Sequence, residues 1–412
     1  MPSPLSPTTI ALVKATVPAL EAHGLAITRR MYERLFVDPA MRDLFNQSHH
    51  GETGSQPKAL ANAVLAYARH IDDLGALAGA VERIAQKHVT LAILPAHYAS
   101  VAEALLGAIR DVLRDAATPE ICAAWGEAYW FLAGILIDRE AAIYHDHEVR
   151  PGGWTGWRDF RIERVTVESE TIRSFVLVPV DGGPVLRHRP GQSLGLRFDL
   201  PGRGVLTRNY SVSCAPDDRA YRITVKREAA PGRPAGLVSH WLHEAARPGT
   251  VLRVAAPAGD FVLDRASSGP VVLVSGGVGL TPMMSMLETI AAETPERPTW
   301  YVHGALNGRV HAMAAQARQL AATCPAIRLH TVYEAPDATD RLGVDHDAVG
   351  RITPDWLVAH APADATYYLC GPKPFLASLV HGLSRLGVPA ERIRYEFFGP
   401  ADELEEAPLQ AA

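Results

Sequence analysis

The residues of this sequence that could carry out chemistry are concentrated in three stretches far apart along the chain. The first is Arg208-Asn209-Tyr210-Ser211, which follows an alternating apolar run typical of a β-strand. An arginine can clamp a pyrophosphate, a tyrosine can stack on a ring system, and a serine hydroxyl can reach a ring nitrogen. The stretch therefore indicates a flavin site, although such residues are also found at ordinary strand ends facing solvent.

The second stretch is a glycine loop, Gly276-Gly277-Val278-Gly279-Leu280-Thr281-Pro282. The apolar residues 271–274 before it are typical of a buried parallel strand, and a helical pattern begins near Pro282. Glycines let the backbone approach a pyrophosphate at a helix start, and a proline in the first turn costs no hydrogen bond. Strand, loop and helix in this order predict a nucleotide site, and the alternative is a tight turn without a ligand.

The third stretch centres on His88, which takes a position where an apolar residue would continue a buried helix face. Glu140 does the same on a later helix, and an unpaired carboxylate in a core costs several kcal/mol. A histidine that ligates a metal normally gives its other ring nitrogen to such an acceptor. We therefore hypothesise that His88 binds iron, that Glu140 lies behind it, and that Tyr98 orients the carboxylate. The alternatives are a core histidine, a glutamate at a solvated helix end and a tyrosine that only fills the core.

Composition restricts the class of protein. A chain of 412 residues is long enough for about two to four domains, and its net charge of −5 gives no electrostatic reason to expect nucleic acid or an anionic membrane as a partner. The four cysteines form no CxxC pair, which argues against a zinc ribbon, an iron–sulfur cluster or a disulfide framework. There is no secretory signal pattern, and no apolar stretch is expected to approach membrane-spanning length. We expect a cytoplasmic protein without stable membrane insertion.

Periodicity divides the chain into a multidomain fold. Residues 1–149 show apolar residues at helical spacing and form an all-α domain of globin size, in which the first helix begins at Pro7 and should end at Gly24. Residues 150–263 change to a period of two and predict an antiparallel β-barrel. Residues 264–401 alternate strands with helices, which predicts a doubly wound α/β domain. The acidic, alanine-rich residues 402–412 are expected to be a disordered tail.

The order of these parts resembles a flavohaemoglobin, a globin fused to a reductase of the ferredoxin-NADP reductase type. The resemblance covers nearly the whole chain, from about residue 10 to residue 400. Its most specific stretches are Ala85-Gln86-Lys87-His88, Asp138-Arg139-Glu140-Ala141, Arg208-Asn209-Tyr210-Ser211, residues 277–282, Cys370-Gly371-Pro372 and Tyr395-Glu396-Phe397-Phe398-Gly399-Pro400. It implies a haem domain at 1–149, an FAD-binding barrel at 150–263 and an NAD(P)-binding domain at 264–401.

The resemblance also implies roles for residues of the globin part. His88 matches the proximal ligand of a haem b iron, and Tyr98 and Glu140 match the partners that form a proximal triad with it. Tyr32 matches a distal tyrosine whose hydroxyl can hydrogen-bond bound oxygen. The further residues that match haem contacts are Phe45, Gln56 and Leu60.

In the reductase part, Lys87 and Glu396 match residues that tune electron flow between the two cofactors. The residues that match FAD or nucleotide contacts are Arg208, Asn209, Tyr210 and Ser211, then Gly277, Val278, Gly279, Leu280, Thr281 and Pro282, and finally Phe397, Phe398, Gly399 and Pro400. Two positions depart from the family. His188 stands where a flavin-contacting tyrosine is common and is expected to contact the FAD in its place, and Ser193 replaces an aromatic residue.

The activity that the resemblance implies is nitric oxide dioxygenation, which detoxifies nitric oxide under nitrosative stress. NAD(P)H reduces FAD, electrons pass singly to the haem, and nitric oxide is oxidised with O2 to nitrate. The expected partners are therefore the small molecules O2, nitric oxide and NAD(P)H, and the protein is expected to be a monomer. Arg309 is a candidate contact for the phosphate of NADPH. The alternatives are a haem-based sensor or carrier kept ferrous by its own reductase, and a reductase of peroxides, quinones or ferric compounds.

Overall fold

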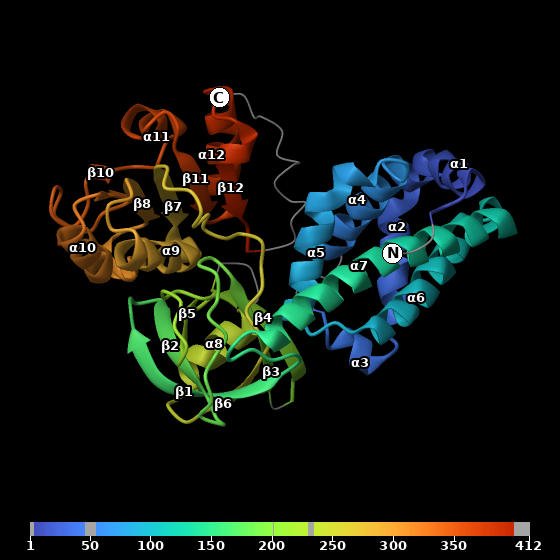
Figure 1. Ribbon diagram of the computed structural model, residues 1–412, viewed down its shortest axis with the longest axis horizontal. Helices are drawn as coiled ribbons and strands as arrows, with labels where there is room; N and C mark the ends of the chain where they lie inside the picture. The colour runs from blue at the N-terminus through green and yellow to red at the C-terminus, as the bar shows by residue number, and fades with distance from the viewer. Residues whose placement is uncertain (1–3, 46–54, 201, 230–234, 399–412) are drawn as a thin grey trace.

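The computed structural model describes residues 4–45, 55–200, 202–229 and 235–398. It contains a helical domain, a curled antiparallel sheet and a parallel sheet covered by helices (Figure 1). In Figure 1 the helical domain lies on the right, and the two sheet domains lie on the left, one above the other. This is the fold class predicted from the sequence. Gly399, Pro400 and the predicted tail lie outside the described residues.

The helical domain is built from seven α-helices among the described residues. They are α1 (Pro7–Ala15), α2 (Val17–Leu35), α3 (Pro39–Arg42), α4 (Ser55–Arg69), α5 (Ala78–Thr90), α6 (Pro95–Leu113) and α7 (Pro119–Val149), with short 3-10 turns η2 (Leu74–Leu77) and η3 (Arg114–Ala116). Capping residues fix where the helices begin. Ser6 accepts a hydrogen bond from the backbone N–H of Thr9 at the start of α1, and Thr118 accepts one from Ile121 at the start of α7.

The prediction that the first helix ends at Gly24 was wrong. The chain bends by 67° between α1 and α2, and α2 then continues through Gly24 to Leu35. Pro18 in the first turn of α2 explains the break, because a proline lacks the N–H that a continuing helix would need and its ring clashes with the preceding turn. The hydroxyl of Thr16 closes the end of α1 by donating to the carbonyl oxygen of Val13 at 2.6 Å.

By length and composition alone, the helix α7 is long and apolar enough to cross a membrane. Two bent pairs of helical segments also reach this length and apolar character when each pair is taken as one span. They are α1 with α2, and Leu74–Thr90 with Pro95–Ala116. The expectation that no apolar stretch approaches this length was therefore too strict. In this fold the apolar side of α7 packs against α1, α5 and α6, and buries Trp125, Ala128 and Leu136.

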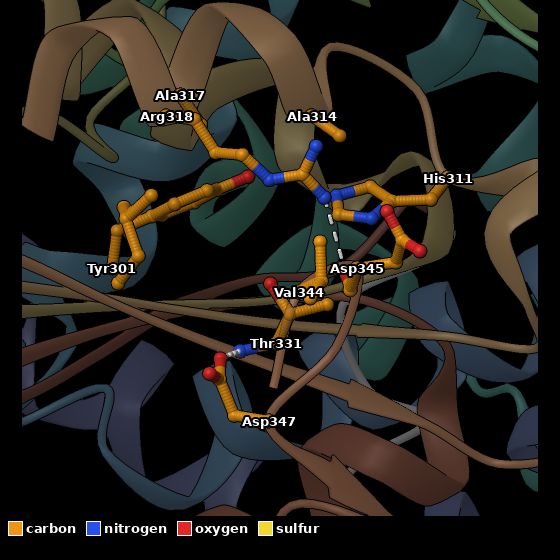
Figure 2. Close-up of a pocket in the computed structure, with 10 residues that line it drawn as sticks. Tyr301, His311, Ala314, Ala317, Arg318, Thr331, Val344, Asp345 and Asp347 are labelled. Carbon is orange, nitrogen blue, oxygen red and sulfur yellow. Dashed lines mark hydrogen bonds between the residues drawn. The ribbon is translucent and has the colours of Figure 1, made fainter. Parts of the chain in front are cut away.

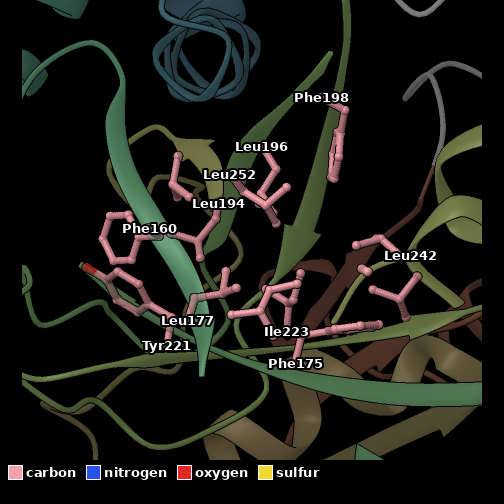
Figure 3. Packing of buried hydrophobic residues seen from close by; sticks show 14 of the residues in the cluster. Phe160, Phe175, Leu177, Leu194, Leu196, Phe198, Tyr221, Ile223, Leu242 and Leu252 are labelled. Atoms are coloured by element: carbon pink, nitrogen blue, oxygen red, sulfur yellow. The ribbon is translucent and has the colours of Figure 1, made fainter. Parts of the chain in front are cut away.

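The curled sheet is formed by six antiparallel strands. They are β1 (Arg158–Val167), β2 (Ile172–Pro179), β3 (Ser193–Leu200), β4 (Gly204–Ser211), β5 (Tyr221–Lys226) and β6 (Val251–Val254), in the order β4-β3-β6-β1-β2-β5, with the helix α8 (Leu237–Glu244). The edge strands meet at a bridge between Val212 and Ile223, so the sheet curls towards a barrel. Figure 3 shows the alternate residues of these strands filling the interior, including Phe160, Phe175 and Leu194.

The third domain is a six-stranded parallel sheet with helices on both faces. Its strands are β7 (Val271–Gly276), β8 (Thr299–Ala305), β9 (Ile327–Tyr333), β10 (Ala348–Val349), β11 (Thr366–Cys370) and β12 (Ile393–Glu396). Its helices are α9 (Leu280–Glu293), α10 (Ala314–Thr323), α11 (Pro354–His360) and α12 (Lys373–Arg385), with 3-10 turns η4 (Gly277–Gly279), η5 (Gly308–Val310) and η6 (Ala390–Arg392). The strand order β10-β9-β8-β7-β11-β12 reverses direction between β7 and β11. Ligands of such sheets bind at this reversal, beyond the carboxyl ends of the strands.

Candidate active site

The three residues of the proposed iron site come together in the helical domain. His88 lies near the end of α5, Tyr98 lies in the first turns of α6, and Glu140 lies within α7. The Oε1 atom of Glu140 is 2.7 Å from Nδ1 of His88 and accepts a hydrogen bond of 2.6 Å from the Tyr98 hydroxyl. Glu140 is only 2% exposed and α7 continues to Val149, which excludes the solvated helix end considered above.

The protonation of this cluster follows from its partners. Burial, and then the hydrogen bond to Glu140, raise the pKa of Tyr98 well above its ordinary value, so the phenol stays protonated and donates. The carboxylate can therefore accept both the phenolic proton and the Nδ1 proton of His88. This leaves Nε2 of His88 as the unprotonated nitrogen, and it makes no hydrogen bond within the described part of the chain.

The cluster fits a haem iron for a second reason. The other oxygen of Glu140, Oε2, is buried and has no hydrogen-bond partner among the described residues. A buried carboxylate with one bare oxygen is costly unless positive charge lies nearby, and an iron on the far side of the imidazole supplies such charge. The described residues contain no group of three His, Cys, Asp or Glu side chains that could hold a bare ion. A single imidazole ligand therefore suits haem better than an all-protein metal site.

Tyr32 and Phe45, the two aromatic residues predicted for the haem pocket, lie together. Tyr32 on α2 is buried, and its ring is 5.5 Å from that of Phe45 and 5.4 Å from that of Phe36. Burial raises the pKa of Tyr32 well above its ordinary value, and a hydrogen bond with the Gln56 side chain acts in the opposite direction. Leu60, one turn further along α4, is only partly buried. The phenol is therefore a protonated donor in apolar surroundings.

The end of α5 joins the helical domain to the flavin motif. The Asn209 side chain donates to the hydroxyl of Thr90 at 2.9 Å, and the N–H of Gly259 donates to the side chain of Gln86 at 2.9 Å. Gly195 on β3 must be a glycine, because an added Cβ would collide with the backbone oxygen of Thr90. Since Thr90 is two residues from His88, the helix that carries the candidate iron ligand also touches the candidate flavin site.

The flavin motif itself forms the end of β4, an edge strand of the curled sheet. Burial lowers the pKa of Arg208, and no carboxylate pairs with this arginine within the described chain. A desolvated guanidinium without an acidic partner is suited to a phosphate. Burial raises the pKa of Tyr210 well above its ordinary value, and Ser211 is buried. These properties fit a pyrophosphate on Arg208 and a ring system beside Tyr210.

A carboxyl group with an unusual pKa lies where the three domains meet. Glu396 ends β12, and its Oε2 atom is buried without a hydrogen-bond partner in the described chain. Burial, and then the charge of Asp260, raise the pKa of Glu396 to about 8, against the opposing effect of Lys87 on α5. The pKa of Asp260 is also raised, mainly by burial. Glu396 is therefore protonated at neutral pH, which the sequence did not indicate.

This pKa makes the stability of the protein depend on pH. A glutamate in an unfolded chain has a pKa near about 4.3. Between that value and about 8 the unfolded chain ionises Glu396 while the folded protein keeps it protonated. The contribution of Glu396 to the free energy of unfolding is thus complete below the unfolded pKa and is lost as the pH rises through the folded pKa. Between the two pKa values the free energy of unfolding falls by at most about 1.4 kcal/mol per pH unit.

Glu396→Gln should therefore unfold at a higher temperature than wild type, by a margin that grows as the pH is raised from about 5 to about 8. The measurement is a thermal unfolding series at several pH values, with exposed Glu391→Gln as the control. If the difference in unfolding temperature between Glu396→Gln and wild type stayed constant over this pH range, the raised pKa of Glu396 would be wrong.

The glycine loop lies at the reversal of the parallel sheet. It connects β7 to α9, and Pro282 takes a place in the first turn of that helix. Gly279 must be a glycine, because an added Cβ would collide with the backbone oxygen of Cys370. This contact holds the loop against the Cys370-Gly371-Pro372 segment that follows β11. The backbone amides at the start of α9 therefore face the edge where nucleotides bind in such sheets.

The candidate phosphate contact Arg309 is already paired with carboxylates. Its guanidinium lies 2.8 Å from Asp337 and 3.9 Å from Glu170. A small cavity of about 170 Å³ lies elsewhere in the same domain, beneath α10. Figure 2 shows Tyr301 of β8, His311, which follows η5, and Arg318 of α10 pointing into it. The structure does not bring any residue predicted for the flavin or the nucleotide to this cavity.

Two protein-family models match the chain in separate parts. A globin model matches residues 29–136, and an oxidoreductase NAD-binding domain model matches residues 273–381. A flavohemoprotein of Xylella fastidiosa (strain 9a5c) is 51% identical over 404 residues, which is 98% of this chain and 99% of the relative. The chain belongs to the flavohaemoprotein family. A flavohemoprotein of Bordetella pertussis is 48% identical over 96% of this chain and 98% of its own length.

Solved structures place this flavohaemoprotein in the same fold. The flavohemoglobin of Malassezia yamatoensis, solved with bound FAD and heme, aligns with a TM-score of 0.84 and 25% identity over 96% of this chain and all of its own. The FAD/NAD-binding domain of a nitric oxide dioxygenase from Vibrio cholerae aligns with a TM-score of 0.53 and 38% identity, over 59% of this chain and 99% of that domain. The chain is thus an NAD(P)H-dependent oxidoreductase of the flavohaemoprotein type.

The role expected for His188 needs correction. This side chain is 2% exposed, and its Nε2 atom lies 3.1 Å from the carbonyl oxygen of Cys214 and 3.1 Å from the hydroxyl of Ser285 on α9. Burial lowers the pKa of His188 to about 4, so the ring is neutral. A ring so enclosed presents almost no surface to a cofactor. The histidine instead connects the curled sheet to the nucleotide-binding domain.

The segment after β12 is described only in part. Phe397 packs against the core formed with α11 and α12, and Phe398 is 46% exposed. Sequence reasoning missed Thr90, which joins the helical domain to the reductase, and Asp260, which raises the pKa of Glu396. The only sequence signal for Thr90 was its position two residues after His88. Asp260 had none, because it acts through residues that are distant along the chain.

Proposed function

We propose that this flavohaemoprotein is a nitric oxide dioxygenase that oxidises nitric oxide with O2 to nitrate, at a haem b reduced by NAD(P)H through FAD. The observation that carries the proposal is the buried cluster of His88, Glu140 and Tyr98, in a domain that also buries the protonated phenol of Tyr32 and on the same chain as a reductase. The similarity of the reductase part to a nitric oxide dioxygenase of Vibrio cholerae supports the same activity.

The residues that would hold the cofactors follow from the contacts above. His88 would ligate the haem through Nε2, Arg208 would hold the pyrophosphate of FAD, and the loop before α9 would hold that of the nicotinamide nucleotide. When bound, FAD splits the electron pair of a hydride into single electrons, and the haem provides a one-electron iron that binds O2.

On the proximal side, the polypeptide controls how strongly His88 donates electrons. Because Nδ1–H donates to the carboxylate of Glu140, the imidazole gains electron density and becomes a stronger ligand. Tyr98 donates to the same oxygen, so it fixes the carboxylate in the orientation that the imidazole needs. If haem is bound, a more strongly donating imidazole would raise the electron density at its iron.

On the distal side, Tyr32 supplies a hydrogen-bond donor. Its raised pKa keeps the proton on the phenol, and the aromatic contacts with Phe36 and Phe45 limit how its ring can move. A fixed donor in apolar surroundings stabilises a developing negative charge more than water does, because no solvent has to reorganise. Together the two sides favour oxidation of nitric oxide over simple storage of O2.

The number of nitrate ions formed for each NADH tests the proposal. Conversion of one nitric oxide and one O2 to nitrate takes one electron, and NADH carries two, so we expect about two nitrate ions for each NADH oxidised. The assay uses the purified holoprotein in aerobic buffer with nitric oxide added in small portions. Slow ligand release with little nitrate would instead indicate a sensor or carrier, and the proposal would be wrong.

A further inference from the structure

A cluster of polar side chains joins α9 to the curled sheet just beyond the flavin motif. At its centre is Glu288 on α9. Its Oε1 atom accepts from Arg222 on β5 at 2.5 Å and from Gln316 on α10 at 2.7 Å, and its Oε2 atom accepts from the backbone N–H of Ala215 at 2.9 Å. The Arg222 and Glu288 side chains are only 18% and 15% exposed.

Arg222, which pairs with Glu288, also binds the segment 213–215. Arg222 also donates to the backbone oxygen of Ser213, and its Nε atom donates to the Ser213 hydroxyl at 3.2 Å. A second contact lies one turn earlier on α9, where Ser285 meets His188, which also lies 3.1 Å from the carbonyl oxygen of Cys214. The helix therefore contacts this short segment directly through Glu288 and, one turn earlier, indirectly through His188.

The position of this cluster relates the two halves of the reductase. The segment 213–215 begins two residues after Ser211, the last residue of the flavin motif. The helix α9 begins directly after the glycine loop. A displacement of α9 against the segment would therefore move the nucleotide loop relative to the flavin site. Hydride transfer requires the reacting atoms to approach within about 3–3.5 Å, and misplacement by about 1 Å can slow such a reaction by about 100-fold.

We propose that Glu288 is a positioning residue for hydride transfer, because it fixes the distance between the nucleotide loop and the flavin motif. In that reaction NAD(P)H loses a hydride and becomes NAD(P)+, and the flavin gains the hydride together with a proton from water. The proposal rests on the flavohaem reductase activity and not on nitric oxide dioxygenation.

The chemistry of the cluster calls for a carboxylate at this position. Three donors converge on two oxygens, and Arg222 brings a largely buried positive charge. Glutamine has one accepting oxygen, so its NH2 group would face either the N–H of Ala215 or the donors of Arg222 and Gln316. Glu288→Gln would therefore leave a donor unpaired and the charge of Arg222 uncompensated, which shifts α9 away from the segment.

The test measures flavin reduction by NADH in the full-length holoprotein without air, by stopped-flow absorbance over a range of NADH concentrations. For Glu288→Gln we expect the limiting rate to fall by roughly tenfold, with an increased isotope effect from NADH deuterated at the transferred position. The NADH dissociation constant and the FAD content should stay within about twofold of wild type. A purely structural role would lower FAD content or affinity together with the rate, and this outcome would overturn the proposal, as would an unchanged limiting rate.

Two further variants complete the experiment. Glu293→Gln is the matched control, because Glu293 lies on the same helix in an exposed ion pair of 2.5 Å with Arg265, and it should reduce flavin at the wild-type rate. Gln316→Leu removes one donor to Glu288 without uncovering a charge, so it decides the question if Glu288→Gln does not fold. It should lower the limiting rate less than Glu288→Gln does, and an unchanged rate would count against the proposal.

The globin supplies an independent measurement. When the iron is reduced chemically, O2 binding by Glu288→Gln should match wild type, whether or not the protein oxidises nitric oxide. A defect that reached O2 binding as well would show general damage and would contradict a positioning role.

Discussion

Replacement of His88 by alanine should abolish nitrate formation while NADH still reduces the flavin at the wild-type rate. The Nε2 atom of His88 is the candidate iron ligand, and its Nδ1 atom is held by Glu140 at 2.7 Å. Loss of a residue that only supports a metal ligand typically costs 10–100-fold, so loss of the ligand itself should lower nitrate formation by more than about 100-fold. The flavin motif and the glycine loop lie in other domains and should be unaffected.

The measurement compares nitrate formation with NADH-driven flavin reduction in the same preparation. His145→Ala is the matched control, because His145 is an exposed histidine on α7. If His88→Ala oxidised nitric oxide at the wild-type rate, His88 would not be the iron ligand. If the protein reduced quinones, peroxides or ferric compounds faster than nitric oxide, with or without His88, the protein would be a reductase of external acceptors.

Glu140→Gln should keep its haem but turn over nitric oxide about 10–100 times more slowly than wild type. Glutamine has nearly the same shape and can still accept one hydrogen bond, so the fold of α7 should be retained. It lacks the negative charge that makes the His88 imidazole a strong donor. The reduction potential of the iron should rise as the donor weakens.

Haem content, the reduction potential and nitrate formation together test this prediction. Glu103→Gln is the control, since Glu103 is exposed on α6 and should behave like wild type in all three. Turnover at the wild-type rate in Glu140→Gln would show that the buried carboxylate does not take part in the reaction. If nitrate formation slowed while the reduction potential of the iron stayed at the wild-type value, Glu140 would not act by strengthening the donation of electrons from His88.

Periodicity in the sequence was sufficient to predict the three architectures. An alternating pattern places Phe160 and Ile162 on one side of β1, and an unbroken apolar run predicts that both faces of β7 are buried. The same reasoning identified Glu140 as a misplaced carboxylate, because its neighbours at helical spacing are apolar. It failed at Gly24, where the local preference of a glycine was outweighed by packing, and the break came earlier at Thr16 and Pro18.

The remaining features could not be predicted because they depend on residues that are distant along the chain. Glu396 acquires its pKa from burial at the end of β12, from Asp260 and from Lys87 on α5. In the sequence, Arg222 and Glu288 are 66 residues apart and look like ordinary surface charges. His188 was assigned to the flavin by its position in the family motif, whereas its hydrogen bond to Ser285 spans 97 residues.

The most direct test of the central claim is the absorbance spectrum of the purified full-length protein, recorded without air before and after NADH is added. We expect a haem spectrum that changes from ferric to ferrous as NADH is consumed, because electrons pass through the flavin to an iron held by His88. An iron that remains ferric in the presence of excess NADH, or a protein without a haem spectrum, would contradict it.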